Sequence, residues 1–228
     1  MCVKTYFVIT QILYLIFQEF CMKAVVSFNT VAKLTVAFVA AFALLSGSVS
    51  AQTTKWKEDV SHSSIGFSVK HLLVSNVKGQ FNDYSVSVLS DKADFSDAKV
   101  TVKIKAQSIN TDNKQRDEHL RSPDFFDASK FSDITFISKK IEKTGKNTFK
   151  ITGDFTMKGV TKTLTLNGEI GGILEKDPWG KTKAGLTLTG EVNRFDYGLN
   201  WNKAIEAGGF VVSETVKLNI ELEIGKEA

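Results

Sequence analysis

Alternation of apolar and polar residues dominates the chain after residue 52 and favours β structure, because successive side chains of a strand point to opposite faces. In residues 64–71, for example, Ile65 and Phe67 alternate with small or polar neighbours. The pattern recurs in seven further segments, residues 77–89, 99–106, 134–141, 148–157, 163–173, 183–192 and 212–224. Short connections at residues 144–147 and 158–161 are typical of hairpin turns.

About eight strands with one apolar face each favour a closed sheet, since closure removes edges that would otherwise pair with other chains. A barrel of ~8 strands has room for packed side chains or for one small ligand. The expected fold class is therefore all-β, an eight-stranded antiparallel barrel, with one short helical segment.

The first 51 residues are expected to lie outside this domain. Residues 22–51 combine two lysines, an apolar run and small residues up to Ala51, as a cleaved secretion signal peptide does. Residues 1–21 form a second apolar stretch that such a leader does not need. We interpret them as an upstream mis-start, with a membrane span as the alternative. The expected mature domain is residues 52–228, exported to the periplasm without stable membrane insertion.

Both cysteines, Cys2 and Cys21, precede this domain, which therefore has no disulfide, thiolate nucleophile or cysteine-ligated metal. The first 51 residues hold three of the 29 basic and one of the 25 acidic residues, so the remainder has a net charge of +2. That balance gives no electrostatic argument for a nucleic-acid partner.

No sequence motif indicates catalysis, since a Gly-x-Ser-x-Gly elbow and a phosphate-binding loop are both missing from the chain. The three histidines, His62, His71 and His119, have no spacing typical of a metal site. Asp117 and His119 stand two residues apart on an expected helix and so face different directions. We therefore expect a protein that is not an enzyme, with no catalytic residue, metal or cofactor.

One charged segment interrupts the strands. Residues 112–121 have helical spacing, with Asp112 as the expected cap, and Pro123 ends the helix. Phe125 and Phe126 then leave at an angle, so that the rings reach the end of the barrel while the charges stay near its rim. Two interpretations remain open: a plug whose charges pair among themselves, or a mouth whose charges bind the polar head of a ligand.

The chain resembles the YceI-like family of bacterial envelope proteins along nearly all of its expected mature length. The segments that carry the resemblance are residues 59–71, 78–81, 116–126, 151–166, 177–185 and 193–201. The run RDEHL, which begins at Arg116, makes it specific. The resemblance implies an extended, lipocalin-like barrel whose interior binds a polyisoprenoid or similar long-chain amphiphile, such as a quinone or polyprenyl phosphate. It also implies export to the periplasm and a homodimer.

The strand face on which each apolar residue lies, together with side-chain chemistry, suggests which residues would bind such a ligand. The expected tunnel residues are Phe67, Val69, Phe81, Val102, Ile104, Phe125, Phe126, Phe136, Phe155, Leu186, Leu188 and Trp201. The expected head-group ligands are His71, Arg116, His119 and Arg121.

Several alternatives stay open for these residues. The apolar face could cover the outside of the barrel at a dimer interface, and His71 could be a structural histidine. Trp201 is expected to close the end of the barrel opposite the charged segment. Arg194 could instead form a structural latch with Asp196 or Glu191. The expected function is a lipid carrier, and the alternative is a structural or stress-protective envelope protein whose barrel is filled by its own rings.

Overall fold

The computed structural model describes residues 18–19, 53–204 and 210–227. Apart from residues 18–19, the expected mis-start and signal peptide lie outside the described residues, as does the cleavage point after Ala51. The compact unit that carries the fold is Thr53–Ala228. Among the described residues, no helix is long and apolar enough to cross a membrane.

Strands make up most of this unit. They are β1 (Lys55–Glu58), β2 (Ser64–His71), β3 (Ser75–Phe81), β4 (Tyr84–Leu89), β5 (Lys99–Lys105), β6 (Ile109–Asn110), β7 (Asp133–Lys143), β8 (Thr148–Met157), β9 (Val160–Leu174), β10 (Lys183–Asn193) and β11 (Val212–Lys226). The helices are α2 (Lys114–Arg121) and the 3-10 turns η1 (Val60–His62), η2 (Ala106–Ser108) and η3 (Arg194–Tyr197).

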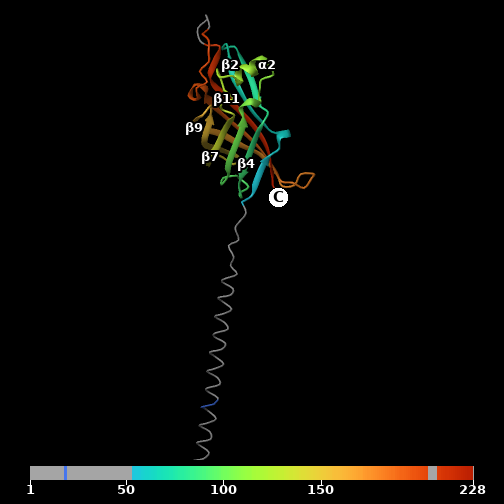
Figure 1. Ribbon diagram of the computed structural model, residues 1–228. Helices are drawn as coiled ribbons and strands as arrows, with labels where there is room; N and C mark the ends of the chain where they lie inside the picture. The colour runs from blue at the N-terminus through green and yellow to red at the C-terminus, as the bar shows by residue number, and fades with distance from the viewer. Residues whose placement is uncertain (1–17, 20–52, 205–209, 228) are drawn as a thin grey trace, which may run out of the picture. The chain divides into compact units, whose positions relative to one another are not determined.

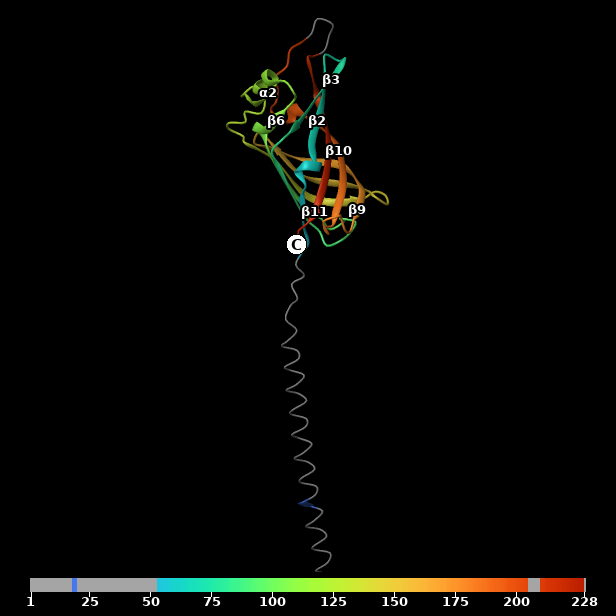
Figure 2. The same cartoon turned by 90° about the vertical axis from the view of Figure 1, so that its right-hand side faces the viewer.

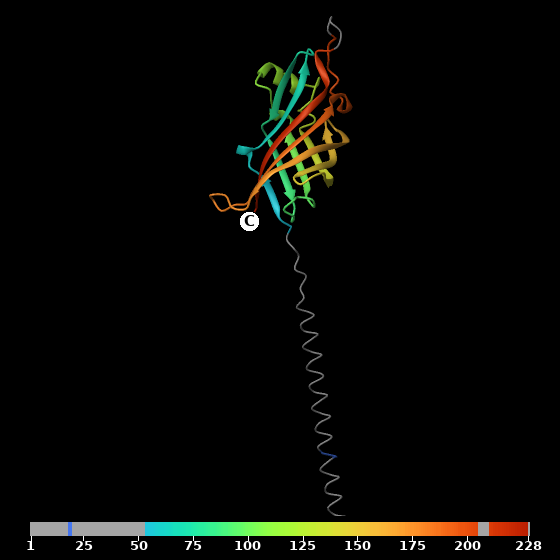
Figure 3. The same ribbon diagram turned by 180° about the vertical axis from the view of Figure 1, so that it is seen from behind.

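Eight of the strands close into a ring in the order β1-β4-β5-β7-β8-β9-β10-β11, because β11 pairs with β1 as well as with β10. Every pairing in the ring is antiparallel. Figure 3 shows red β11 and cyan β1 completing the ring from behind. The expected eight-stranded antiparallel barrel with one helical segment is confirmed.

The barrel is extended at one end by β2, β3 and β6, which continue the sheet beyond β11. β1 and β2 both pair with β11 and are separated only by η1, so they form one interrupted wall strand. Figures 1 and 2 show that α2 lies beside this extension. The helix therefore covers the end of the barrel that the extension lengthens.

Alternation along the strands builds the interior. In β8, Phe149, Ile151, Gly153, Phe155 and Met157 are buried, while the residues that alternate with them are more exposed. Phe155 lies opposite Phe136 of β7 in the strand register. Because neighbouring strands present the same face inward, their apolar side chains meet inside the ring.

Residues 77–89, expected as one strand, are two. β3 ends at Phe81 and β4 begins at Tyr84, because the chain there passes from pairing with β2 and β6 to pairing with β1 and β5. At residues 82–83 the chain thus leaves the extension and enters the ring.

The expected cap of the helix at Asp112 is wrong by one residue. Asn113 is the N-cap, and its side-chain oxygen accepts a hydrogen bond from the Arg116 N–H at 3.0 Å. Asp112 has a left-handed φ of 58°, whereas a capping residue needs an extended backbone. The helix ends at Arg121, before extended Ser122 and Pro123, as the sequence predicts.

Candidate functional site

The barrel encloses one large cavity of about 190 Å³. This is more than ten times the space that one water molecule needs, roughly 10–15 Å³. Every described residue that lines it is apolar or glycine except Arg194, and the wall presents almost no polar atom. Its lining reaches from Phe95 and Phe149 to Val69 and Val212 near α2. The cavity is thus shaped for a hydrocarbon and offers nothing to hold a polar group inside.

Eleven of the twelve expected tunnel residues line this cavity. They are Phe67, Val69, Phe81, Val102, Ile104, Phe125, Phe126, Phe136, Phe155, Leu186 and Leu188. The apolar parity of the strands therefore turns inward in the structure. That these side chains contact a ligand stays a prediction.

Trp201 does not lie at the opposite end of the barrel, and this expectation is wrong. Its ring centroid lies 5.3 Å from that of Phe125 and 5.1 Å from that of His119, so it covers the α2 end from outside the cavity lining. The reason is that Arg194 holds the Trp201 carbonyl at 2.9 Å, which keeps this segment beside the start of β11.

The two rings that follow Pro123 close the cavity at this end. Phe125 is buried and meets the His119 ring edge-on at 5.0 Å, while Phe126 meets Phe81 edge-on at 5.9 Å. Edge-to-face contacts of this kind favour fixed ring positions. The segment thus covers the barrel end with its rings, as the plug interpretation proposed, but Arg116, Asp117 and Arg121 do not pair among themselves as that interpretation expected.

None of the four expected head-group ligands lines the cavity, and both arginines bind backbone. Arg116 donates to the Thr111 hydroxyl at 2.7 Å and to the Thr111 carbonyl at 2.6 Å. Arg121 donates to the carbonyls of Gln107 at 2.8 Å and Ile109 at 2.7 Å. These bonds tie α2 to the segment that precedes it.

The two histidines differ in their surroundings. His119 lies 3.1 Å from a carboxylate oxygen of Asp124 with its side chain 40% exposed, at the outer side of the rings. His71 ends β2, half-buried, opposite Ser75 and Val212. Binding of a head group by the four expected residues stays a prediction, and His119 lies against the Phe125 ring.

Asp117 is buried and does not stay at the rim with the other charges. Its carboxylate accepts the Thr111 N–H at 2.9 Å and the Thr111 hydroxyl at 2.6 Å. Two such bonds satisfy a buried carboxylate. Asp117 and Arg116 therefore hold the same threonine from two sides, which fixes the helix over the cavity end.

Arg194 is the functional-site residue whose position the sequence interpretation missed. It is buried, and its guanidinium donates to the carbonyls of Leu199, Trp201, Val212 and Ser213. Burial lowers the pKa of Arg194. Every second residue from Leu186 and Leu188 onward shares one strand face, and this series includes residue 194. The sequence pattern could therefore have predicted that Arg194 points inward. The expected pairing with Asp196 or Glu191 does not form among the described residues.

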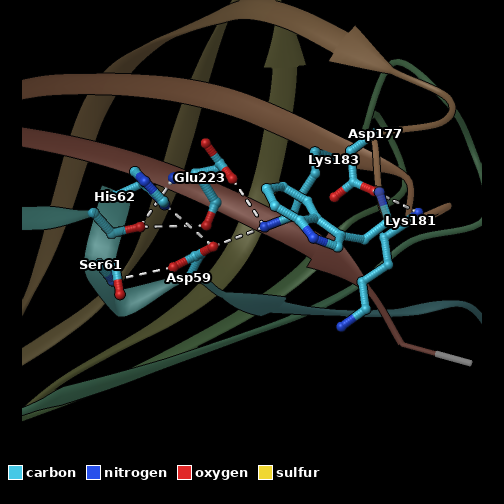
Figure 4. Close-up of polar contacts among 9 residues, drawn as sticks. Asp59, Ser61, His62, Asp177, Lys181, Lys183 and Glu223 are labelled. Carbon is cyan, nitrogen blue, oxygen red and sulfur yellow. Dashed lines mark hydrogen bonds and ion pairs between the residues drawn. The ribbon is translucent and has the colours of Figure 1, made fainter.

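A second polar cluster joins distant parts of the ring. Lys183 of β10 lies 2.8 Å from a carboxylate oxygen of Asp59 and 2.9 Å from one of Glu223 (Figure 4). His62 lies 3.3 Å from Asp59. The donor atoms of Asp59, His62 and Glu223 are within 4.8 Å of one another, which a metal could use. The Lys183 ammonium already supplies the cation that the two carboxylates need, so the cluster acts as a latch between β10, β11 and the start of η1, which Asp59 caps.

This latch should make stability depend on acid pH. The hydrogen bonds from Lys183 and His62 lower the pKa of Asp59 from 3.8 to about 2. Because the folded-state pKa is the lower one, the stabilisation is present above pH 3.8 and is lost as the pH falls toward 2. We expect about 1 kcal/mol, since the partly exposed side chains are screened by solvent.

Substitution of Lys183→Met should remove this pH dependence. Between pH 4 and pH 2, urea unfolding should show a smaller fall in the free energy of unfolding than in the wild type, by about 1 kcal/mol. Lys181→Met is the matched control, because Lys181 has no ion pair among the described residues. Equal pH slopes for Lys183→Met and wild type would show that the latch contributes nothing.

Comparison with known proteins matches this architecture. The family model described as YceI-like domain matches residues 56–224. UPF0312 protein SAS2572 of Staphylococcus aureus (strain MSSA476) is 41% identical over 170 residues, which cover 75% of this chain and 96% of that protein.

Two solved structures have a similar fold. The Campylobacter jejuni YCEI protein is 41% identical, with a TM-score of 0.60 over 70% of this chain and 90% of that one. A polyisoprenoid binding domain from Saccharophagus degradans, implicated in plant cell wall breakdown, is 15% identical, with a TM-score of 0.53 over 77% of this chain and all of that one. At that identity, the second structure supports the fold alone.

Proposed function

Because the chain belongs to the YceI-like family, we propose that its barrel binds an isoprenoid or similar long-chain lipid and carries it in the periplasm. The observation that carries the proposal is the cavity, whose described lining is apolar apart from Arg194. The guanidinium of Arg194 is turned to four backbone carbonyls, so the wall has no polar partner for a ligand. The polyisoprenoid binding named for the Saccharophagus degradans domain suggests the ligand class.

Burial of the hydrocarbon supplies the affinity. Each Å² of apolar surface removed from water contributes roughly 25 cal/mol, so a chain of several isoprene units gains several kcal/mol before ordering costs. A branched chain without polar groups also needs no directional contact. A cavity lined by rings and aliphatic side chains is suited to such a ligand.

The polar head of the ligand would stay outside the cavity, at the α2 end. A head group inside would lose its hydration without gaining a hydrogen bond, which costs several kcal/mol. His119 lies partly exposed beside the rings there, and Arg116, Arg121 and His71 are the other expected ligands. A quinone or a polyprenyl phosphate would both satisfy this arrangement.

The proposed role is binding and not catalysis. The described cavity wall carries no hydroxyl, carboxylate or imidazole that could act as nucleophile, acid or base. Asp117 and His119 do not form an acid–base pair, because Asp117 is committed to Thr111. Incubation with a polyprenyl phosphate ester should therefore return it unchanged.

Native mass spectrometry of protein from its own periplasm, followed by organic extraction, tests the proposal. We expect one lipid for each barrel, and a protein mass that begins at Gln52 if the signal peptide is cleaved as expected. A barrel that is empty, and stays empty after incubation with quinones and polyprenyl phosphates, would instead favour the structural or stress-protective role. The same spectra report whether the expected homodimer forms.

A further inference from the structure

The connection between β2 and β3 exposes three apolar residues in succession. Leu72, Leu73 and Val74 are 39%, 59% and 82% exposed, and neighbouring Phe210 is 49% exposed. The Leu72 N–H donates to the Val211 carbonyl at 2.9 Å, so the two segments lie side by side. We call these four apolar residues the β2–β3 tip. An exposed apolar cluster of this kind marks an interaction site more often than chance exposure does.

The backbone of the tip makes its apolar sequence unusual. Leu72 and Leu73 have φ angles of 50° and 63°, in the left-handed region where glycine and asparagine are the ordinary residues. Leucine there costs backbone strain in addition to exposed apolar surface. Among the described residues, packing recovers neither cost, since Leu73 and Val74 are 59% and 82% exposed.

The tip lies at the end of the barrel that α2 covers (Figures 1 and 2). Val69 and Val212 line the cavity and stand a few residues from the tip in β2 and β11. Figures 1 and 2 show the β2–β3 connection at the same end of the barrel as α2. A surface that holds this tip would therefore face the covered end of the cavity.

Three exposed lysines lie near the tip. Lys70, Lys78 and Lys203 are exposed, and the described residues give none of them an ion pair. Glu214 is the exposed acid on the neighbouring start of β11, where Asn193 contacts it. Exposed apolar side chains next to lysines are suited to the surface of an anionic bilayer. The apolar side chains can enter the boundary between head groups and acyl chains, and the ammonium groups can bind lipid phosphates.

We propose that the β2–β3 tip inserts into the surface of an anionic lipid bilayer and docks the barrel there with its α2 end toward the membrane. This goes beyond the proposed carrier function, because docking is measured without any bound cargo. It adds the step at which lipid passes between bilayer and cavity.

Vesicle sedimentation with the mature chain, stripped of lipid, tests the proposal. Vesicles of phosphatidylcholine with phosphatidylglycerol should bind at least about tenfold more tightly than phosphatidylcholine alone, since each lysine near an anionic surface adds affinity. The double variant Leu73→Asn/Val74→Ser should lower binding to the anionic vesicles by about tenfold or more. Its melting temperature should equal or exceed that of the wild type, because asparagine tolerates the left-handed backbone.

A matched control lies at the opposite end of the barrel. Trp179, 82% exposed, belongs to the β9–β10 connection, drawn in orange near the C-terminus in Figure 1, and Leu174, 53% exposed, ends β9 just before it. Trp179→Ser/Leu174→Ser should leave vesicle binding unchanged. Unchanged binding by the tip variant, or loss in the control instead, would overturn the proposal. A third outcome would also overturn the proposal. If the wild type does not bind vesicles but forms a dimer, and the tip variant does not form that dimer, the tip binds a second copy of the chain. Lipid retention, measured separately, reports on the carrier function alone.

Discussion

The Phe67→Asp variant is expected to lose its bound lipid, with retention at least about a hundredfold lower than in the wild type. Phe67 lines the cavity, and its ring lies against Phe81 at a centroid distance of 5.8 Å. An aspartate there would place a carboxylate in a wall without polar atoms, where it must either lose its hydration or draw water into the path of the hydrocarbon. Native mass spectrometry after equal incubation with the extracted lipid gives the occupancy.

The next residue provides the matched control. Ser68 points to the outer face of β2, where it stands opposite Lys78 of β3 and Lys217 of β11. Ser68→Asp adds the same charge one residue away, between two ammonium groups that favour it. It should retain lipid as the wild type does. Equal retention by both variants, with native far-UV circular dichroism, would show that the lipid does not occupy this cavity.

Alternation along the strands predicted the ring and which apolar side chains share a face, while the choice between an inward and an outward face stayed open. Phe136 and Phe155 come from two expected strands, and the structure places them opposite each other inside the barrel. Period-two alternation determines which face a side chain joins, and a closed ring leaves one interior for all the apolar faces. No long-range information was needed for this part of the site.

What parity could not predict depends on contacts between distant residues or on backbone angles. Asp59 and Lys183 are 124 residues apart in the chain, so no local pattern indicated their ion pair. Asp112 resembles a cap in sequence, but its left-handed backbone excludes it. Trp201 was expected at the wrong end, because its position depends on Arg194.

Substitution of Arg194 should have the largest effect on stability. Its guanidinium joins the residues that follow η3 to the start of β11, with Nε 2.9 Å from the Ser213 carbonyl and an Nη 2.9 Å from that of Trp201. Arg194→Met would remove these two donors and the buried hydrogen bond to the Leu199 carbonyl. We expect a loss of roughly 3–5 kcal/mol in the free energy of unfolding, measured with urea, because several acceptors lose their donor at about 1–3 kcal/mol each.

Arg194→Lys should lose most of the same free energy, although it keeps the charge. Lysine presents its three donors from one atom and cannot reach carbonyls on two separate segments as a planar fork does. The controls are Glu191→Gln and Asp196→Asn, the carboxylates that the sequence suggested as partners. Asp196 instead pairs with Lys162 at 2.7 Å on the surface, so both controls should stay within about 0.5 kcal/mol of the wild type. If either control matched the loss of Arg194→Lys, a carboxylate and not the four carbonyls would hold this end of the barrel.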